Sequence, residues 1–171
     1  MFSRMMIASL VLVSFSGLLY AGEFHDKKNN LSARFPGTVK TIHQNDMPGM
    51  TMTMHLSSQQ SVVYLAGSLT AAREKAEPGQ LKELIIPYLE GVDSKLKNMR
   101  VIKQGETKLH EQSPDGYWFL VKHDEGFQIH WITIENGKMY FVKVSAKEES
   151  TLQTKQVKQF LDSINISRAS K

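Results

Sequence analysis

One run in the sequence concentrates side chains that could bind a soft metal: Met47-Pro-Gly-Met50-Thr-Met52-Thr-Met54-His55. Thioether sulfur is a soft ligand that favours copper(I). If residues 50–56 form a strand, the two-residue period places the methionines of that strand on one face and His55 on the other. The preceding loop could add further ligands. The run therefore predicts a candidate copper(I) site composed of Met50, Met52, Met47 and His43.

The segment Met47-Pro-Gly-Met50-Thr-Met52 also resembles the W-P-E-M-T-M run of CusF-like periplasmic copper-binding domains. It differs in having Met47 where that run has tryptophan, and the upstream histidine lies closer to the methionine pair. The alternative is that the methionines form the buried side of an ordinary strand, because methionine fills irregular cores. A strand of a globular domain needs an apolar face in any case. We therefore favour no cofactor and keep copper(I) as the alternative.

The histidines do not have the spacing of a zinc ligand set. His25 lies in a polar leading segment, and His110 stands near a turn beside Glu111. With Asp124-Glu125-Gly126 as a hairpin loop, His123 and His130 point to opposite faces of the sheet. The same register places Trp118 and Trp131 on opposite faces.

Other motifs of known chemistry are absent from the sequence. It contains no cysteine, and it has no G-x-S-x-G, H-E-x-x-H, P-loop or G-x-G-x-x-G pattern. The formal charge of +4 comes from dispersed lysines, whereas a nucleic-acid surface needs clustered basic residues. We expect a chain that is not an enzyme and does not bind nucleic acid. Its expected partner is an envelope protein or a small ligand, and it is expected to be a monomer or weak oligomer.

Residues 1–21 have the pattern of a secretory signal peptide. Arg4 precedes an uncharged, mostly apolar run over residues 5–19, and Leu19-Tyr20-Ala21 is an acceptable cleavage site before Gly22. The run is shorter than the roughly 20 residues that span a bilayer. The absence of cysteine excludes a lipoprotein anchor and disulfides. The sequence thus predicts a periplasmic or secreted protein without a transmembrane segment after signal cleavage.

The remaining chain predicts a flexible polar lead at residues 22–30, one domain at 31–166 and a tail at 167–171. Strands are expected at 50–56, 61–69, 101–110, 117–122, 127–134 and 139–144, with a bulge at Gly105. An apolar stripe predicts a helix at 78–96 that is kinked or broken at Pro87. A capping box at Ser150 and Gln153 predicts a second helix at 151–163. This order predicts an α+β fold, an antiparallel sheet covered by helices on its faces as an α/β/α sandwich.

Short motifs in this order resemble the PsbP-like fold family, which includes exported bacterial members of unknown function. They are Leu31 to Gly37, Val62-Val63-Tyr64, a strand ending near Gly105, Gly137 to Tyr140, and Phe160 to Ile164. The chain departs from the family at residues 110–116, where relatives often have a Gly-x-x-Gly pair. The resemblance implies a non-catalytic assembly or interaction subunit, and it supplies no catalytic residue to carry over.

Overall fold

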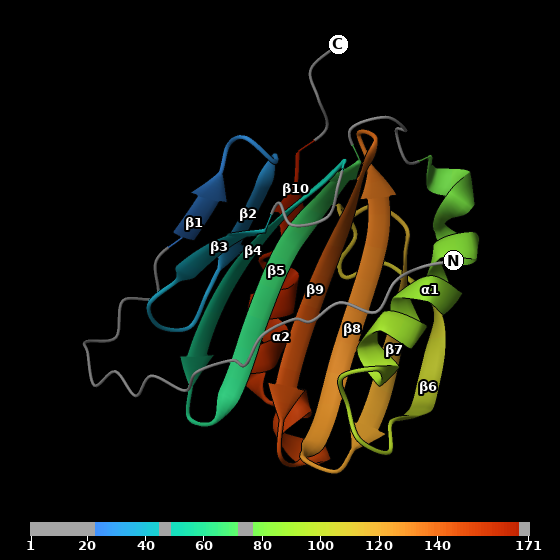
Figure 1. Cartoon of the computed structure of the whole chain (residues 1–171). Coiled ribbons are helices and arrows are strands. Elements are labelled where there is room, and N and C mark those ends of the chain that lie inside the picture. The colour runs from blue at the N-terminus through green and yellow to red at the C-terminus, as the bar shows by residue number, and fades with distance from the viewer. Residues whose placement is uncertain (1–22, 45–48, 72–76, 168–171) are drawn as a thin grey trace.

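The computed structural model describes residues 23–44, 49–71 and 77–167, which form two antiparallel sheets and two α-helices (Figure 1). The predicted signal peptide at 1–21 and Met47 lie outside the described residues. The seven-stranded sheet has the order β3-β4-β5-β9-β8-β7-β6, and the three-stranded sheet has the order β1-β2-β10. The elements are β1 Glu23–Asp26, β2 Leu31–Arg34, β3 Lys40–Gln44, β4 Met50–Gln59, β5 Val62–Ala71, the 3₁₀ turn η1 Pro78–Gln80, α1 Leu81–Asp93, β6 Arg100–Thr107, β7 Gly116–His123, β8 Gly126–Glu135, β9 Lys138–Ala146, the 3₁₀ turn η2 Glu149–Gln153, α2 Lys155–Asp162 and β10 Asn165–Ile166.

The strands predicted from the turn residues form the centre of the large sheet. Asn136 and Gly137 both have positive φ, 54° and 73°, as a type I′ turn requires, and they join β8 to β9. The predicted hairpin of residues 50–56 and 61–69 is β4 paired with β5. Its turn places Gln60 and Ser61 at φ 50° and 66° without any glycine. The local turn chemistry therefore does predict which strands are neighbours.

The register between β7 and β8 differs by one residue from the prediction. His123 pairs with Gly126, so the loop consists of Asp124 and Glu125 only. A shift of one residue reverses the face on which a side chain lies relative to the partner strand. Trp118 consequently lies directly opposite Trp131, and both point to the same face. His123 and His130 also share a face, contrary to the prediction.

The helices are shorter than the sequence predicts. Helix α1 continues through Pro87, and both Pro87 and Glu83, four residues earlier, are exposed. The carbonyl that loses its intrahelical partner is thus on the solvent side, where water can bind it. Helix α2 begins at Lys155, because Thr154 is its N-cap and accepts a hydrogen bond from the Val157 N–H. The predicted capping box at Ser150 lies in η2 instead.

The α+β antiparallel architecture is confirmed, but helices do not cover the two faces as an α/β/α sandwich. Helix α1 contacts β7 and β8 on one face, and its Ile85 packs with Phe119 and Ile132. The other face packs against α2, whose Phe160 contacts Phe35 and Tyr64, and against the small sheet. That sheet includes β1, which lies in the predicted flexible lead and pairs with β2. Each helix therefore covers only part of a face (Figure 1).

The irregularity of β6 lies between Val101 and Lys103, not at the predicted Gly105. Within the described ranges, no helix combines the length and the apolar character needed to cross a membrane.

Candidate functional site

Strand β4 is inverted in polarity relative to an ordinary core strand. Its most buried side chains are polar: Thr53, His55 and Ser57 are between 2% and 4% exposed. Its apolar side chains lie on the opposite face, where Met50 is 41% exposed and Met52 and Met54 are half-buried. Met52 and Met54 nevertheless pack against the core cluster that contains Ile85, Phe119 and Phe141, as the favoured interpretation of the sequence expected, whereas Met50 is exposed. An apolar face left partly open next to a buried polar face is typical of a binding surface.

The open side continues across two further strands. Leu69 on β5 lies opposite Met52 on β4, and Met139 on β9 lies on the far side of Leu69. We define the apolar band as six residues of this face: Met50, Met52, Met54, Leu65, Leu69 and Met139. Helix α1 contacts β7 and β8. On this face, no helix among the described residues lies in front of β4 and β5 (Figure 1).

The structure brings together only part of the predicted copper(I) ligand set. Met50 and Met52 lie two residues apart on the same face of β4. His43 lies on the opposite face, because it pairs with Thr53 and its Nδ1 is 3.2 Å from the Thr53 hydroxyl. Met47 is outside the described residues. The methionine ligands that the described residues offer are therefore Met50, Met52 and Met54, without an imidazole.

A series of hydrogen bonds centred on His55 connects β4 to the neighbouring strand β3 and to β1, which is distant in sequence. His55 Nε2 lies 2.9 Å from the Asp26 carboxylate on β1, and His55 Nδ1 lies 3.0 Å from the Thr41 hydroxyl on β3. Because a carboxylate only accepts, His55 donates from Nε2 and accepts from Thr41 in its neutral form. Burial lowers the pKa of His55, and the neighbouring Asp26 only partly offsets this.

These hydrogen-bonded residues supply the acid, imidazole and hydroxyl groups of a nucleophilic triad. The sequence analysis did not predict that they lie together. Asp26 and His55 are 29 residues apart, and no local pattern relates them. Phe24 packs on the His55 ring at 4.2 Å between centroids, and Asn29 holds Asp26 through its side-chain amide. We interpret the hydrogen bonds of Asp26, His55 and Thr41 as contacts that hold the small sheet against β4.

A second buried histidine lies on the face that carries the apolar band. His130 is 1% exposed, its Nδ1 is 3.0 Å from the Tyr88 hydroxyl on α1, and its Nε2 is 2.9 Å from Gln128 Oε1. Burial, together with the charges of Lys143 and His123, lowers the pKa of His130 to about 3. Burial also raises the pKa of Tyr88. Both groups are therefore neutral at physiological pH, which fixes α1 on the sheet without an ion pair.

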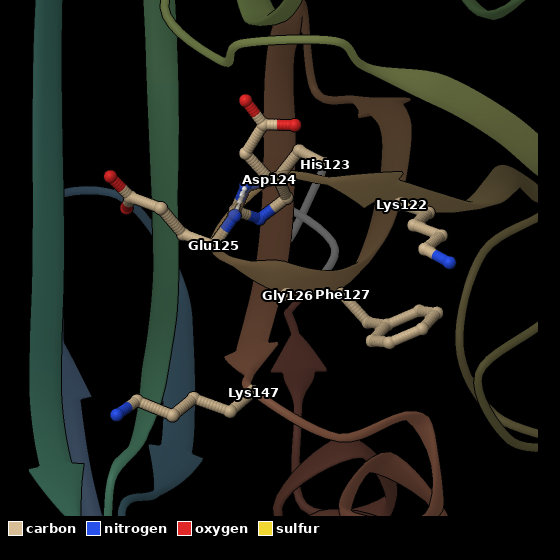
Figure 2. Close-up of a pocket in the computed structure, with 7 residues that line it drawn as sticks. All are labelled: Lys122, His123, Asp124, Glu125, Gly126, Phe127 and Lys147. Atoms are coloured by element: carbon tan, nitrogen blue, oxygen red, sulfur yellow. Dashed lines mark hydrogen bonds between the residues drawn. The ribbon is translucent and has the colours of Figure 1, made fainter.

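A shallow hollow surrounds the turn between β7 and β8 (Figure 2). Lys122 and Phe127 lie on one side of the turn, with the ammonium 5.6 Å from the ring centroid, and Glu125 and Lys147 lie on the other side (Figure 2). The His123 imidazole accepts the backbone N–H of Glu125 at 3.3 Å. These polar groups do not converge on one point, so the hollow has no arrangement for chemistry.

Another hollow, of about 380 Å³, lies between α2 and the sheet. Trp118 and Trp131 line it with Leu109, Ile129 and Leu161. Trp131 belongs to the core and donates its indole N–H to the Thr107 carbonyl at 3.2 Å. The exposed lining is mostly apolar, and the Trp131 indole N–H is already bonded to Thr107. The hollow therefore offers packing surface but no arrangement for chemistry.

Comparison with solved structures identifies the fold. The solution structure of cyanobacterial PsbP (CyanoP) from Synechocystis sp. PCC 6803 is similar, with a TM-score of 0.58, 12% sequence identity, and coverage of 91% of this chain and 99% of that chain. No family model matches the sequence, and no curated protein matches it. The match covers nearly the whole described domain and confirms the fold expected from the ordered motifs.

Proposed function

We propose that this chain, which has the PsbP-like fold, is an exported, non-catalytic binding or assembly protein of the bacterial envelope. The observation that carries the proposal is the apolar band. It leaves Met50 exposed and five further apolar side chains half-buried, while the opposite face of the same strand buries Thr53, His55 and Ser57. The five half-buried side chains already pack against the core cluster around Phe119 and Phe141, and a partner that covers the band would remove their remaining apolar surface, and that of Met50, from water.

The sequence of residues 1–21 supports export. Its basic start, short apolar run and small residues before Gly22 are those of a cleaved signal. A chain without cysteine is also compatible with an oxidising compartment, because no thiol can form an unwanted disulfide there.

The proposal is tested by photo-cross-linking in the bacterium that encodes the chain, with a photoreactive phenylalanine analogue at Met50. The expected result is a mature chain that begins at Gly22 in the periplasmic or secreted fraction and forms one adduct of discrete mass. The control places the analogue at Lys122, an exposed residue on the other face of the sheet. Retention of residues 1–21 in the cytoplasm contradicts export, and equal adducts from both positions contradict binding at the band.

A second function, copper(I) binding, is favoured by one observation. Met50, Met52 and Met54 alternate on one face of β4, and none of them is fully buried. Thioethers favour copper(I), and flexible methionine side chains from alternate positions can turn toward a common point. The site would consist of sulfur ligands alone.

Copper(I) binding is measured under reducing conditions in competition with a chromophoric chelator. Binding of one copper(I) by the mature chain, lost in the Met50→Leu/Met52→Leu variant, is the expected outcome of a metal site. Met139→Leu is the matched control, because Met139 lies on the band but two strands away from Met52. Absence of binding, or equal binding by the double variant, contradicts a copper(I) site at these methionines.

A further inference from the structure

A lysine without an ion-pair partner among the described residues lies on the face that carries the apolar band. Lys143 on β9 lies between Leu65 on β5 and His130 on β8, and it is half-buried. Among the described residues, no carboxylate forms an ion pair with it and no acceptor bonds to it. Burial lowers the pKa of Lys143, and the charge of nearby Lys95 lowers it further. A half-buried ammonium without a counter-charge is costly.

The neighbours of Lys143 do not supply this counter-charge. His130 is neutral and already bonded to Tyr88 and Gln128. Lys95, an exposed residue in the segment after α1, adds a second positive charge. This end of the face therefore combines two cations with the apolar side chain of Leu65. A ligand that is apolar along its length and anionic at one point would complement it.

The geometry of the band favours a helix as the ligand. Neighbouring strands lie about 4.8 Å apart, so β4, β5 and β9 together span about 10 Å, which is close to the diameter of an α-helix. Helix α1 already packs on β7 and β8 beside the band. Each of the three band strands has a neighbouring strand on both sides, and on β4 the pairing with β3 covers Met52 to Leu56, so the backbone groups of these residues are used within the sheet. A partner strand therefore cannot add here, and only side chains are available for binding.

We propose, on the basis of the interaction function above, that the apolar band binds an amphipathic helix of a partner protein whose apolar face is flanked by an acidic residue that pairs with Lys143 and Lys95. The methionines suit this role, because flexible thioether side chains adapt to different helices. The recognition mode is that of a helix laid on an apolar surface, with anchors one turn apart.

The test maps the cross-linked segment of the partner. The photoreactive analogue is placed at Leu69, which lies between Met52 and Met139 at the middle of the band. Mass spectrometry of the adduct is expected to identify a segment with apolar residues three and four positions apart and an Asp or Glu beside them. Lys95→Glu is expected to reduce the adduct yield at least tenfold, and replacing the partner's acidic residue by lysine in that background is expected to restore it.

Matched variants separate charge pairing from loss of structure. Lys97→Glu changes an exposed lysine in the same segment and is expected to leave the yield unchanged. Lys143→Met keeps an apolar chain of similar length and is expected to reduce the yield without unfolding the protein. An adduct with a second copy of the chain, with lipid, or with a loop of the partner overturns the proposal, as does a yield that Lys95→Glu does not change.

Cross-linking from two other positions distinguishes failure of the helix-binding proposal from failure of the proposed interaction function. Ile86 on α1 and Ile102 on β6 are exposed, at 65% and 41%. Adducts from Ile86 or Ile102 but not from Leu69 contradict the helix-binding site and agree with an interaction function at another surface. If no adduct forms from Leu69, Ile86, Ile102 or Met50, both the helix-binding site and the proposed interaction function are contradicted.

Discussion

The free energy of unfolding is expected to fall steeply as the pH is lowered from about 6.5 toward 4, with His130 as a principal cause. A histidine in the unfolded chain takes up a proton near its ordinary pKa of about 6.5. In the folded chain His130 stays neutral until about pH 3, because it is buried against Phe119 and beside Lys143. The unfolded state thus binds more protons throughout this window. Its free energy falls relative to the folded state by about 1.4 kcal/mol for each pH unit below 6.5.

The hydrogen bonds of His130 define which protonation state is stable. Gln128 Oε1 can only accept, so His130 donates from Nε2, and its Nδ1 accepts the Tyr88 hydroxyl. Protonation at Nδ1 would place a donor opposite the Tyr88 donor and a positive charge near Lys143. The Tyr88 hydroxyl would have to turn, and the two charges would still repel each other.

Urea unfolding at several pH values between about 7.5 and 4.5 measures this effect. The His130→Gln variant keeps a side chain that can form hydrogen bonds but cannot titrate. It is expected to be less stable than the unmodified chain at neutral pH and to lose stability less steeply below pH 6.5. His25→Gln, which changes an exposed histidine, is the control and is expected to keep the original slope. Equal slopes for the unmodified chain and His130→Gln contradict the prediction.

Replacing Asp26 by alanine is expected to destabilise the fold by about 2–4 kcal/mol. The Asp26 carboxylate accepts from the Asn29 backbone at 3.1 Å, from the Asn29 side chain at 2.7 Å and from His55 at 2.9 Å. Asn29 and His55 are both buried. Their donors would lose a partner away from water, and unsatisfied buried donors account for most of the expected cost.

The same contacts predict how this contribution depends on pH. Burial raises the pKa of Asp26, but hydrogen bonds from Asn29 and His55 outweigh it and hold the pKa below its usual value. The stabilisation is therefore complete above the ordinary pKa near 3.8, and it is lost as the pH falls through the lower value of the folded state.

Denaturant unfolding at neutral pH of Asp26→Ala and Asp26→Asn, with Asp115→Ala as control, measures the effect. Asp26→Asn keeps one acceptor and is expected to cost less than Asp26→Ala. Asp115 is exposed and lies 3.8 Å from Lys108, so its removal is expected to change stability by less than about 0.5 kcal/mol. If Asp26→Ala lowers the free energy of unfolding as little as Asp115→Ala does, the hydrogen bonds through His55 do not hold the small sheet.

The turn residues illustrate how far local sequence predicts this fold. Asn136-Gly137 predicted the turn between β8 and β9, because both residues tolerate the positive φ that a type I′ turn needs. Asp124-Glu125-Gly126 predicted a turn as well, but not its length. Gly126 belongs to β8 and pairs with His123. Loop length sets the register, so this one residue brought the two tryptophans, and the two histidines, to the same face.

The sequence by itself determined the central strands, the two helices, their order and hence the α+β class, because hydrophobic periodicity and turn chemistry act over a few neighbouring residues. The PsbP-like fold was expected from the resemblance of short motifs, and the structural comparison confirms it. It also determined that Met50, Met52 and Met54 share a face. Only the tertiary structure decided that, among the described residues, this face is partly exposed while the opposite face of β4 is buried. Strands β1, β2 and β10 come from the two ends of the domain, and they belong to the small sheet that Asp26 ties to β4. Burial depends on what packs against a strand, and those contacts join residues far apart in the chain.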